Sequence, residues 1–259
     1  MAFERPKLEF KASTGLFGPS LIVLLAVWFV AARLLDSRAL PGPEDVASFL
    51  VHEAIAGPLF SELGVTLLRV AVSFAISMVI GSALGILLGL FPALNLFFDP
   101  WLTVLLNIPA VVFIVLAYIW LGLNETAAIF AVVLNKFPNV AVTLREGARA
   151  LDTSYSDMAT VFRFSRLKTL KHVVLPQLEP FFAAATRSGI ALIWKIVLVV
   201  ELLGRSNGVG FEIHLHFQMF DLSAILGYTI AFAVVILAIE YWAVKPMERR
   251  SRRWRGRHA

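Results

Sequence analysis

Six apolar segments, each close to the length that a helix needs to cross a bilayer, constrain this chain more than any other feature. A hydrocarbon core takes roughly 20 predominantly apolar residues in helical form. With 59% hydrophobic and only 16% charged residues, the 259-residue chain is too apolar for an ordinary soluble domain. We therefore predict an all-α integral membrane protein with six transmembrane helices. The predicted spans are Leu16–Leu35, Thr66–Leu90, Leu102–Leu121, Thr126–Leu144, Phe181–Leu203 and Ser223–Val244.

These spans divide the chain into an N-terminal segment, a first span with its connection, a core and a basic tail. The corresponding ranges are 1–15, 16–65, 66–244 (with a polar loop at 145–177) and 245–259. The first span follows Arg5, Lys7 and Lys11, as the apolar region of a secretory signal peptide does. However, it is long, and no A-x-A-type site followed by a soluble domain succeeds it, so we interpret it as a retained signal-anchor.

The distribution of Lys and Arg predicts the orientation. The connection 145–172 holds six of these residues and the tail 245–258 holds seven. The connection between the first two spans instead holds five carboxylates and two arginines. Since positively charged loops stay in the cytoplasm, both termini and the polar loop are expected there, with the acidic connection outside. The formal net charge of +5 is then a consequence of topology, and we expect no role in binding nucleic acid.

The second predicted span carries small residues at every fourth position. They are Ser73, Ser77, Gly81, Gly85 and Gly89. Because lipid gives helices no hydrophobic reason to associate, close backbone approach along such a stripe supplies the packing contacts instead. This stripe is expected to face protein, either within the subunit or across a dimer.

The polar loop between the fourth and fifth spans contains a short amphipathic pattern over 157–176. At helical spacing, apolar side chains gather on one face of the pattern and basic ones cover much of the rest, which predicts a short amphipathic helix from Asp157 to Leu170. The Leu175-Pro176 step is expected to stop this helix. Its charge alone fits two partners, the anionic lipid surface or another protein.

The order of residues in this loop resembles the signature loop of ATP-binding cassette (ABC) importer permeases. In that family a Glu-Ala-Ala triplet precedes a Gly by four residues, and an Ile-x-Leu-Pro ending follows. Here Asp157-Met158-Ala159 stands at the triplet and Val173-Val174-Leu175-Pro176 at the ending, with the spacing kept. Arg163 stands at the Gly position, and Arg tolerates positive φ poorly where Gly does so freely.

The resemblance covers most of the chain from about Thr66 onward and is greatest to the nitrate, sulfonate, taurine and bicarbonate branch. Further matching positions are Asn107-Ile108-Pro109, Trp120-Leu121-Gly122-Leu123, Phe137-Pro138, Glu146-Gly147-Ala148-Arg149, Ala191, Trp194, Glu201, Gly208-Val209-Gly210 and Phe220-Asp221.

This resemblance implies a type I ABC importer permease fold in the bacterial cytoplasmic (inner) membrane. It also implies a homodimer or pseudo-dimer that works with two cytoplasmic ABC ATPase subunits, an external substrate-binding protein and the lipid membrane. ATP would bind the partner ATPases, and no cofactor is expected in this chain.

The same resemblance assigns roles within the polar loop, which would form a coupling helix between spans four and five. Polar contacts to the ATPase would come from Asp157, Arg163 and Arg166. The groove of the ATPase would receive Ala159 and Phe162, and Leu175 and Pro176 would fix the loop to the fifth span.

Ionisable and amide side chains inside the predicted spans are candidates for a translocation path, because a charge there costs several kcal/mol unless it is paired or hydrated. The candidates are Asn107, Asn135, Lys136, Asn139, Lys195 and Glu201. Lysines lining a path shared by two subunits would favour an anion. Internal pairing, or snorkelling toward an interface, is the alternative explanation for each charge. At the outer end of the second span, Arg69 is also expected to snorkel.

Several other functions find no support in the sequence. The chain has no cysteine, so thiol-based metal or redox chemistry is excluded, and the His214-x-His216 pair lacks accompanying acidic or Cys ligands. No G-x-x-x-x-G-K-[ST], H-E-x-x-H or G-x-S-x-G motif is present, so we do not expect an enzyme. Two alternatives to an ABC permease stay open: an ion-coupled secondary transporter, which usually shows inverted repeats, and a membrane scaffold subunit without transport.

Overall fold

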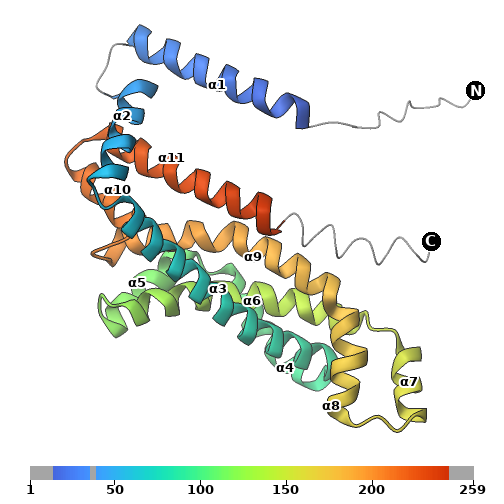
Figure 1. Cartoon of the computed structure of the whole chain (residues 1–259). Helices are drawn as coiled ribbons and strands as arrows, with labels where there is room; N and C mark the ends of the chain where they lie inside the picture. The colour runs from blue at the N-terminus through green and yellow to red at the C-terminus, as the bar shows by residue number, and fades with distance from the viewer. Residues whose placement is uncertain (1–13, 36–38, 245–259) are drawn as a thin grey trace, which may run out of the picture.

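The computed structural model describes residues 14–35 and 39–244, and in this part of the chain helices joined by short connections are the only secondary structure (Figure 1). The elements are α1 Thr14–Leu35, α2 Pro43–Ile55, α3 Leu59–Leu90, α4 Pro92–Asn107, α5 Ala110–Leu121, α6 Glu125–Arg149, α7 Thr153–Val161, α8 Arg166–Thr169, η1 Leu170–Val174, α9 Leu175–Gly204, α10 Val209–Gln218, α11 Leu222–Ile239 and η2 Glu240–Val244, where η marks a π-helix. The predicted basic tail and N-terminal segment lie outside the described residues, apart from the first turn of α1.

Five helical segments of the described chain are long and apolar enough to cross a membrane, and the count rises to six if the bent pair α4–α5 is one span. The predicted all-α membrane fold is thus confirmed. The third predicted span is wrong as a straight helix, because α4 and α5 meet at 96°. Pro109 has no N–H to continue the helix, and Ile108 before it takes an extended conformation (φ −76°, ψ 125°).

The small-residue stripe of α3 packs against α6, as predicted for a protein-facing stripe. A Cβ built on Gly85 would overlap the carbonyl oxygen of Ala141, and one on Gly89 would overlap the Cβ of Ala148. The two helices run in parallel and approach so closely that only glycine fits at these positions. α3 and α6 therefore form the central pair of the bundle, and α9 packs against both.

The bundle has two distinct ends (Figure 1). At the first, here called the α2–α10 end, α2 and α10 pack against α11 around a buried cluster that includes Leu59, Val209 and Tyr228. At the opposite end, here called the α7–α8 end, α7 and α8 form a hairpin that projects from the bundle before the chain returns through α9. The sites described below lie at these two ends.

Candidate functional site

The α7–α8 hairpin (Thr153–Thr169) begins and turns through local capping bonds. Asp152 is the N-cap of α7 and its carboxylate accepts a hydrogen bond from the backbone N–H of Ser154 at 2.9 Å, which lowers the pKa of this exposed carboxyl. Ser165 caps α8 in the same way by accepting from the N–H of Lys168. Each cap supplies an acceptor to a helix N-terminus that would otherwise have unpaired donors. The hairpin is thus defined by its own side chains.

Arg163 closes the turn between the two helices in a left-handed conformation, with φ 51°. The N–H of Phe164 donates to the carbonyl of Ala159 at 2.8 Å, and the N–H of Arg163 donates to the carbonyl of Thr160 at 3.0 Å. These two bonds are those of a Schellman motif, whose left-handed position is usually glycine. The tight turn between two short helices therefore forms even with Arg in place of Gly, and the predicted single helix from Asp157 to Leu170 is wrong.

Pro176 does not stop a helix, contrary to the sequence prediction. The segment from Arg166 to Gly204 is continuous through the π-helix η1, and Leu175 and Pro176 are the first two residues of α9. A proline ring clashes with the carbonyl four residues earlier in an α-helix, and the wider π-turn directly before it relieves this conflict. Leu175 and Pro176 therefore lie in the continuous segment that joins the hairpin to α9, and their role in fixing the loop to the fifth span stays a prediction.

The exposed surface of the hairpin differs in part from the predicted contact set. Ala159 is only 3% exposed, so its predicted insertion into a partner's groove is wrong, because its side chain is already covered by the rest of the chain. Phe162 is 68% exposed and projects freely, as do Val161 and Leu167 at 77% and 79%. The charged groups of the predicted set, Asp157, Arg163 and Arg166, are exposed as well.

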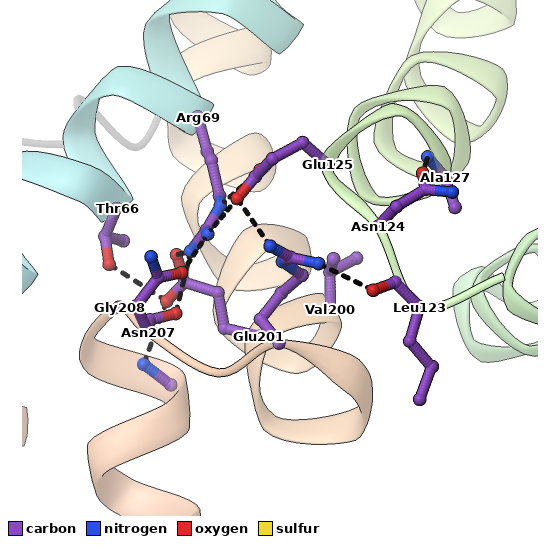
Figure 2. A network of polar contacts seen from close by, with 12 residues as sticks. Thr66, Arg69, Leu123, Asn124, Glu125, Ala127, Val200, Glu201, Asn207 and Gly208 are labelled. Carbon is purple, nitrogen blue, oxygen red and sulfur yellow. Dashed lines mark hydrogen bonds and ion pairs between the residues drawn. The ribbon is translucent and has the colours of Figure 1, made fainter.

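Near the α2–α10 end, Arg69 of α3 lies at the centre of a polar cluster (Figure 2). Its guanidinium contacts Glu201 of α9 at 2.7 Å and Glu125 of α6 at 2.5 Å, and it also donates to the backbone carbonyl of Asn207 at 2.9 Å. The Arg69 side chain is 5% exposed and that of Glu201 is fully buried. One cation therefore ties together α3, α6, α9 and the loop before α10.

Glu201 has a complete set of partners within the cluster. Besides Arg69 it accepts hydrogen bonds from the Thr66 hydroxyl and from the N–H of Gly210, both at 2.9 Å. Thr66 in turn accepts from the N–H of Val209 at 2.8 Å. The buried side chains of Thr66 and Glu201 thereby both have hydrogen-bond partners, as buried polar groups require.

The Arg69 cluster changes two sequence interpretations. Arg69 does not snorkel to the interface, since it is buried and paired, and Glu201 does not line a path in this conformation, since it has no exposed surface. Internal pairing, the alternative considered for Glu201, is the correct explanation. The sequence offered a signal for this pair, because both charges stand near the same end of their spans, but the partner helices could not be identified without the fold.

The remaining path candidates differ in exposure. Lys136 is 1% exposed and its Nζ donates to the carbonyl of Ser188 at 3.3 Å, so it also fails to reach a surface in this conformation. Asn135 and Asn139 are partly buried, whereas Asn107 and Lys195 are exposed. The candidates thus do not form one continuous cluster within the single chain.

Arg187 is an exposed residue of α9 that the sequence reasoning missed. It lies two helical turns before Lys195, about 12 Å along the axis. Both are on the side of α9 away from Ala185, Gly189 and Ile193, which face the bundle. The polar signal at Arg187 was present in the sequence, but its exposure depends on which face of α9 packs inward.

The His214-x-His216 pair has local partners. His214 contacts Gln218 at 2.7 Å, and His216 lies 3.8 Å from Glu212 and 3.6 Å from Asp221. Within residues 14–35 and 39–244, no group of three or more His, Cys, Asp or Glu side chains is placed to hold a metal ion.

The fold and the hairpin together define a class, a multi-span α-helical membrane protein that carries a projecting helical hairpin at one end of its bundle. Residues 77–243, more than half of the chain, match the family model described as the binding-protein-dependent transport system inner membrane component, so the chain belongs to this family of ABC importer permeases. Components of this family are not enzymes themselves. The resemblance stated from the sequence is therefore confirmed.

Curated relatives cover nearly the whole chain. A putative aliphatic sulfonates transport permease protein of Bacillus subtilis is 28% identical over 93% of this chain and 87% of its own length. The taurine transport system permease protein of Escherichia coli is 26% identical over 92% and 88%, and a bicarbonate transport system permease protein of Synechococcus elongatus is 29% identical over 83% and 82%. A solved structure of an amino acid ABC transporter shares the fold, with a TM-score of 0.62, 19% identity, and coverage of 78% of this chain and 98% of that one.

Proposed function

We propose that this permease subunit forms half of a translocation path for a small anion that an external binding protein delivers. Relatives named for sulfonates, taurine and bicarbonate support this class of solute, and nitrate belongs to the same chemical range. The observation that carries the proposal of an ATP-driven permease is the α7–α8 hairpin. Its apolar tip is exposed, and its second helix, α8, is continuous with α9.

In the proposed orientation the α7–α8 end faces the cytoplasm of a bacterial inner membrane. The six Lys and Arg residues of 145–172 support this orientation through the positive-inside rule. In Figure 1 the start of α1 and the end of α11 point toward the α7–α8 end, in agreement with both termini being cytoplasmic. The acidic α2–α10 end then lies outside.

The hairpin is proposed to dock on a cytoplasmic ABC ATPase, one for each of two permease copies. Phe162, Val161 and Leu167 would enter an apolar groove, while Asp157 and Arg166 would form polar contacts at its rim. ATP binding would draw the two ATPases together, and the continuous segment from Arg166 to Gly204 would transmit that movement into the bundle. ATP is bound and hydrolysed by the partner in this scheme.

A second copy of the chain is proposed to cover the exposed faces of α1 and α9. Only 6% of the α1 span window is buried, so lipid or another chain must cover this helix. Arg187 and Lys195 are both exposed on α9, and the charge of Lys195 would cost several kcal/mol against lipid but not beside a hydrated path. We propose that this face of α9 lines an anion path between two copies. Asn107, Asn135 and Asn139 would also contribute to the path, since they are less buried than Lys136.

The absence of cysteine from the sequence allows a direct test of docking. A Phe162→Cys variant should cross-link to a single cysteine placed in the ATPase groove, whereas Phe60→Cys, 69% exposed at the opposite end, should not. Leu167→Asp should reduce ATP-driven uptake in proteoliposomes at least tenfold. Uptake that continues without ATP and follows an ion gradient would overturn the proposal in favour of a secondary transporter. Normal assembly with no uptake of any of these four solutes would favour a scaffold.

The path is tested separately by Lys195→Met and Arg187→Met. Each variant should lower the uptake of an anion several-fold without releasing the ATPase from the complex, because the charge acts on the solute and lies far from the hairpin. Arg149→Met, a charge change at an exposed position outside the hairpin, is the matched control for net charge. Normal anion uptake in both α9 variants would refute the path.

A further inference from the structure

A pocket of about 300 Å³ opens at the α2–α10 end, beside the last turn of α9. Its apolar lining comes from the turn between α5 and α6, from α9 and from α10, and consists of Leu123, Leu202, Leu203 and Phe211. Arg205, in the loop that follows α9, adds a guanidinium to this lining. Within residues 14–35 and 39–244, no carboxylate lines the pocket. Apolar walls and a cation therefore meet in one cavity.

Arg205 is the less fully paired of two guanidiniums that share Glu125. Arg69 contacts both oxygens of this carboxylate, at 2.9 and 2.5 Å, and also contacts Glu201 at 2.7 Å (Figure 2). Arg205 contacts one Glu125 oxygen, which Arg69 also uses, at 2.7 Å, and it donates to the carbonyl of Leu123 at 2.9 Å. Its Nε is buried and has no hydrogen-bond partner in the part of the chain that the structure describes. A guanidinium has five N–H donors, so Arg205 can bind a further acceptor.

The pocket lies at the outer end of the face of α9 that carries Lys195. Leu202 follows Lys195 by two helical turns, about 10 Å along the axis, and both side chains are exposed. In the proposed orientation, a solute that arrives from outside meets this pocket before it reaches Lys195. The pocket is therefore placed to receive the solute at the entrance of the proposed path.

The lining of the pocket favours one class of anion. A guanidinium binds a carboxylate or sulfonate through two parallel N–H···O bonds, which suits either group as the charged head of a ligand. Nitrate and bicarbonate have no apolar part to cover the leucine and phenylalanine side chains. A short alkyl chain would remove this surface from water, and each buried methylene strengthens binding about fourfold.

We propose that this pocket is an entry site for a small organic oxyanion, a sulfonate or carboxylate on a short alkyl chain. Arg205 binds the charged head, and Leu203 and Phe211 contact the chain. The head takes the place of Glu125 at Arg205, while Glu125 stays paired with Arg69. The proposal rests on the proposed function for the outward orientation and for the path along α9. It adds the entry site and a preference for organic over inorganic anions.

The test measures binding of radiolabelled 1-butanesulfonate and methanesulfonate to the whole transporter in nanodiscs, without a binding protein. Butanesulfonate should bind saturably and at least about tenfold more tightly, because the two probes share a head and differ by three methylenes. Arg205→Gln should weaken its binding at least tenfold, whereas Arg205→Lys, which keeps the charge, should retain most of it. Arg33→Gln is the matched control, since it removes a 67% exposed cation at the same end of the bundle. Absence of saturable binding, or equal losses in Arg205→Gln and Arg33→Gln, would overturn the proposal.

Two further variants test the exchange with Glu125 and the apolar wall. Glu125→Gln removes the competing carboxylate, so it should strengthen butanesulfonate binding several-fold; weaker binding would overturn the exchange. Leu203→Ser should weaken the binding of butanesulfonate but not that of methanesulfonate, and an unchanged preference between the two would overturn the role of the wall.

Failure of the proposed function would give a different result. Proteoliposomes supplied with ATP and the binding protein would then show no uptake of any anion, although butanesulfonate still bound the transporter through Arg205. That outcome would support the pocket and refute the proposed function. Normal uptake of anions together with no effect of Arg205→Gln on binding would refute the pocket and leave the proposed function standing.

Discussion

Replacing Arg69 by leucine should destabilise the protein strongly, because Glu201 would be left as a buried carboxylate without its cation. Glu201 has no exposed surface, and it keeps only the hydroxyl of Thr66 and the N–H of Gly210 as donors. Breaking a buried ion pair by removing one partner costs about 3–5 kcal/mol. We expect a loss of this size in the free energy of unfolding for Arg69→Leu.

The companion variants define the interaction itself. Glu201→Leu should cost about 2–4 kcal/mol, since Arg69 keeps Glu125 and the Asn207 carbonyl while two buried donors lose their acceptor. The double variant should cost about 3–5 kcal/mol, because no unpaired charge remains buried. At the middle of these ranges it would therefore be about 3 kcal/mol more stable than the sum of the single changes predicts.

Reversible unfolding in mixed micelles of dodecyl sulfate and a mild detergent, followed by tryptophan fluorescence, measures these free energies. Arg149→Leu is the matched control, since its ion pair with Glu146 is exposed and should contribute no more than about 1 kcal/mol. The reasoning is refuted if Arg69→Leu resembles this control, or if the two single losses simply add in the double variant.

Three further outcomes follow from the packing. Arg163→Gly should stabilise the hairpin by about 1 kcal/mol, measured as slower proteolysis within 150–170, because Gly adopts the left-handed conformation freely; faster cleavage would contradict this. Gly85→Ala should lower the free energy of unfolding by about 1–3 kcal/mol through overlap with α6, whereas Gly64→Ala should not, because the space around Gly64 is open. Equal melting temperatures for the two variants would refute the close packing. The pKa of Glu212 is raised, mainly by burial and to a smaller degree by two nearby carboxylates on α2 and α3. The folded state therefore binds this proton more tightly than the unfolded state does, and the protein gains stability as the pH falls through the raised pKa. Glu212→Gln should therefore raise the melting temperature most at high pH and least near about pH 4, and a gain that is constant with pH would contradict the assignment.

The loop between the fourth and fifth spans shows where local sequence was sufficient and where it was not. The spacing from Asp157 to Pro176 identified the family segment, and the substitution at Arg163 marked the position of the turn. Whether the turn would form with Arg could not be decided from the sequence, because it depends on two backbone bonds that offset the strain. The same holds for Ala159. The sequence indicated that its small side chain would be covered, but it could not show whether the chain itself or a partner protein would cover it.

The sequence by itself determined that this chain is a multi-span membrane protein, that its second span packs closely, and to which family it belongs. Membrane insertion depends on the local run of apolar residues, and close packing depends on a repeat within one helix, so both properties can be read along the chain. The tertiary structure alone decided that Arg69, Glu125 and Glu201 meet and that Lys136 is enclosed. These contacts join helices far apart in sequence, and which charges are paired or left exposed depends on how those helices are oriented around one another.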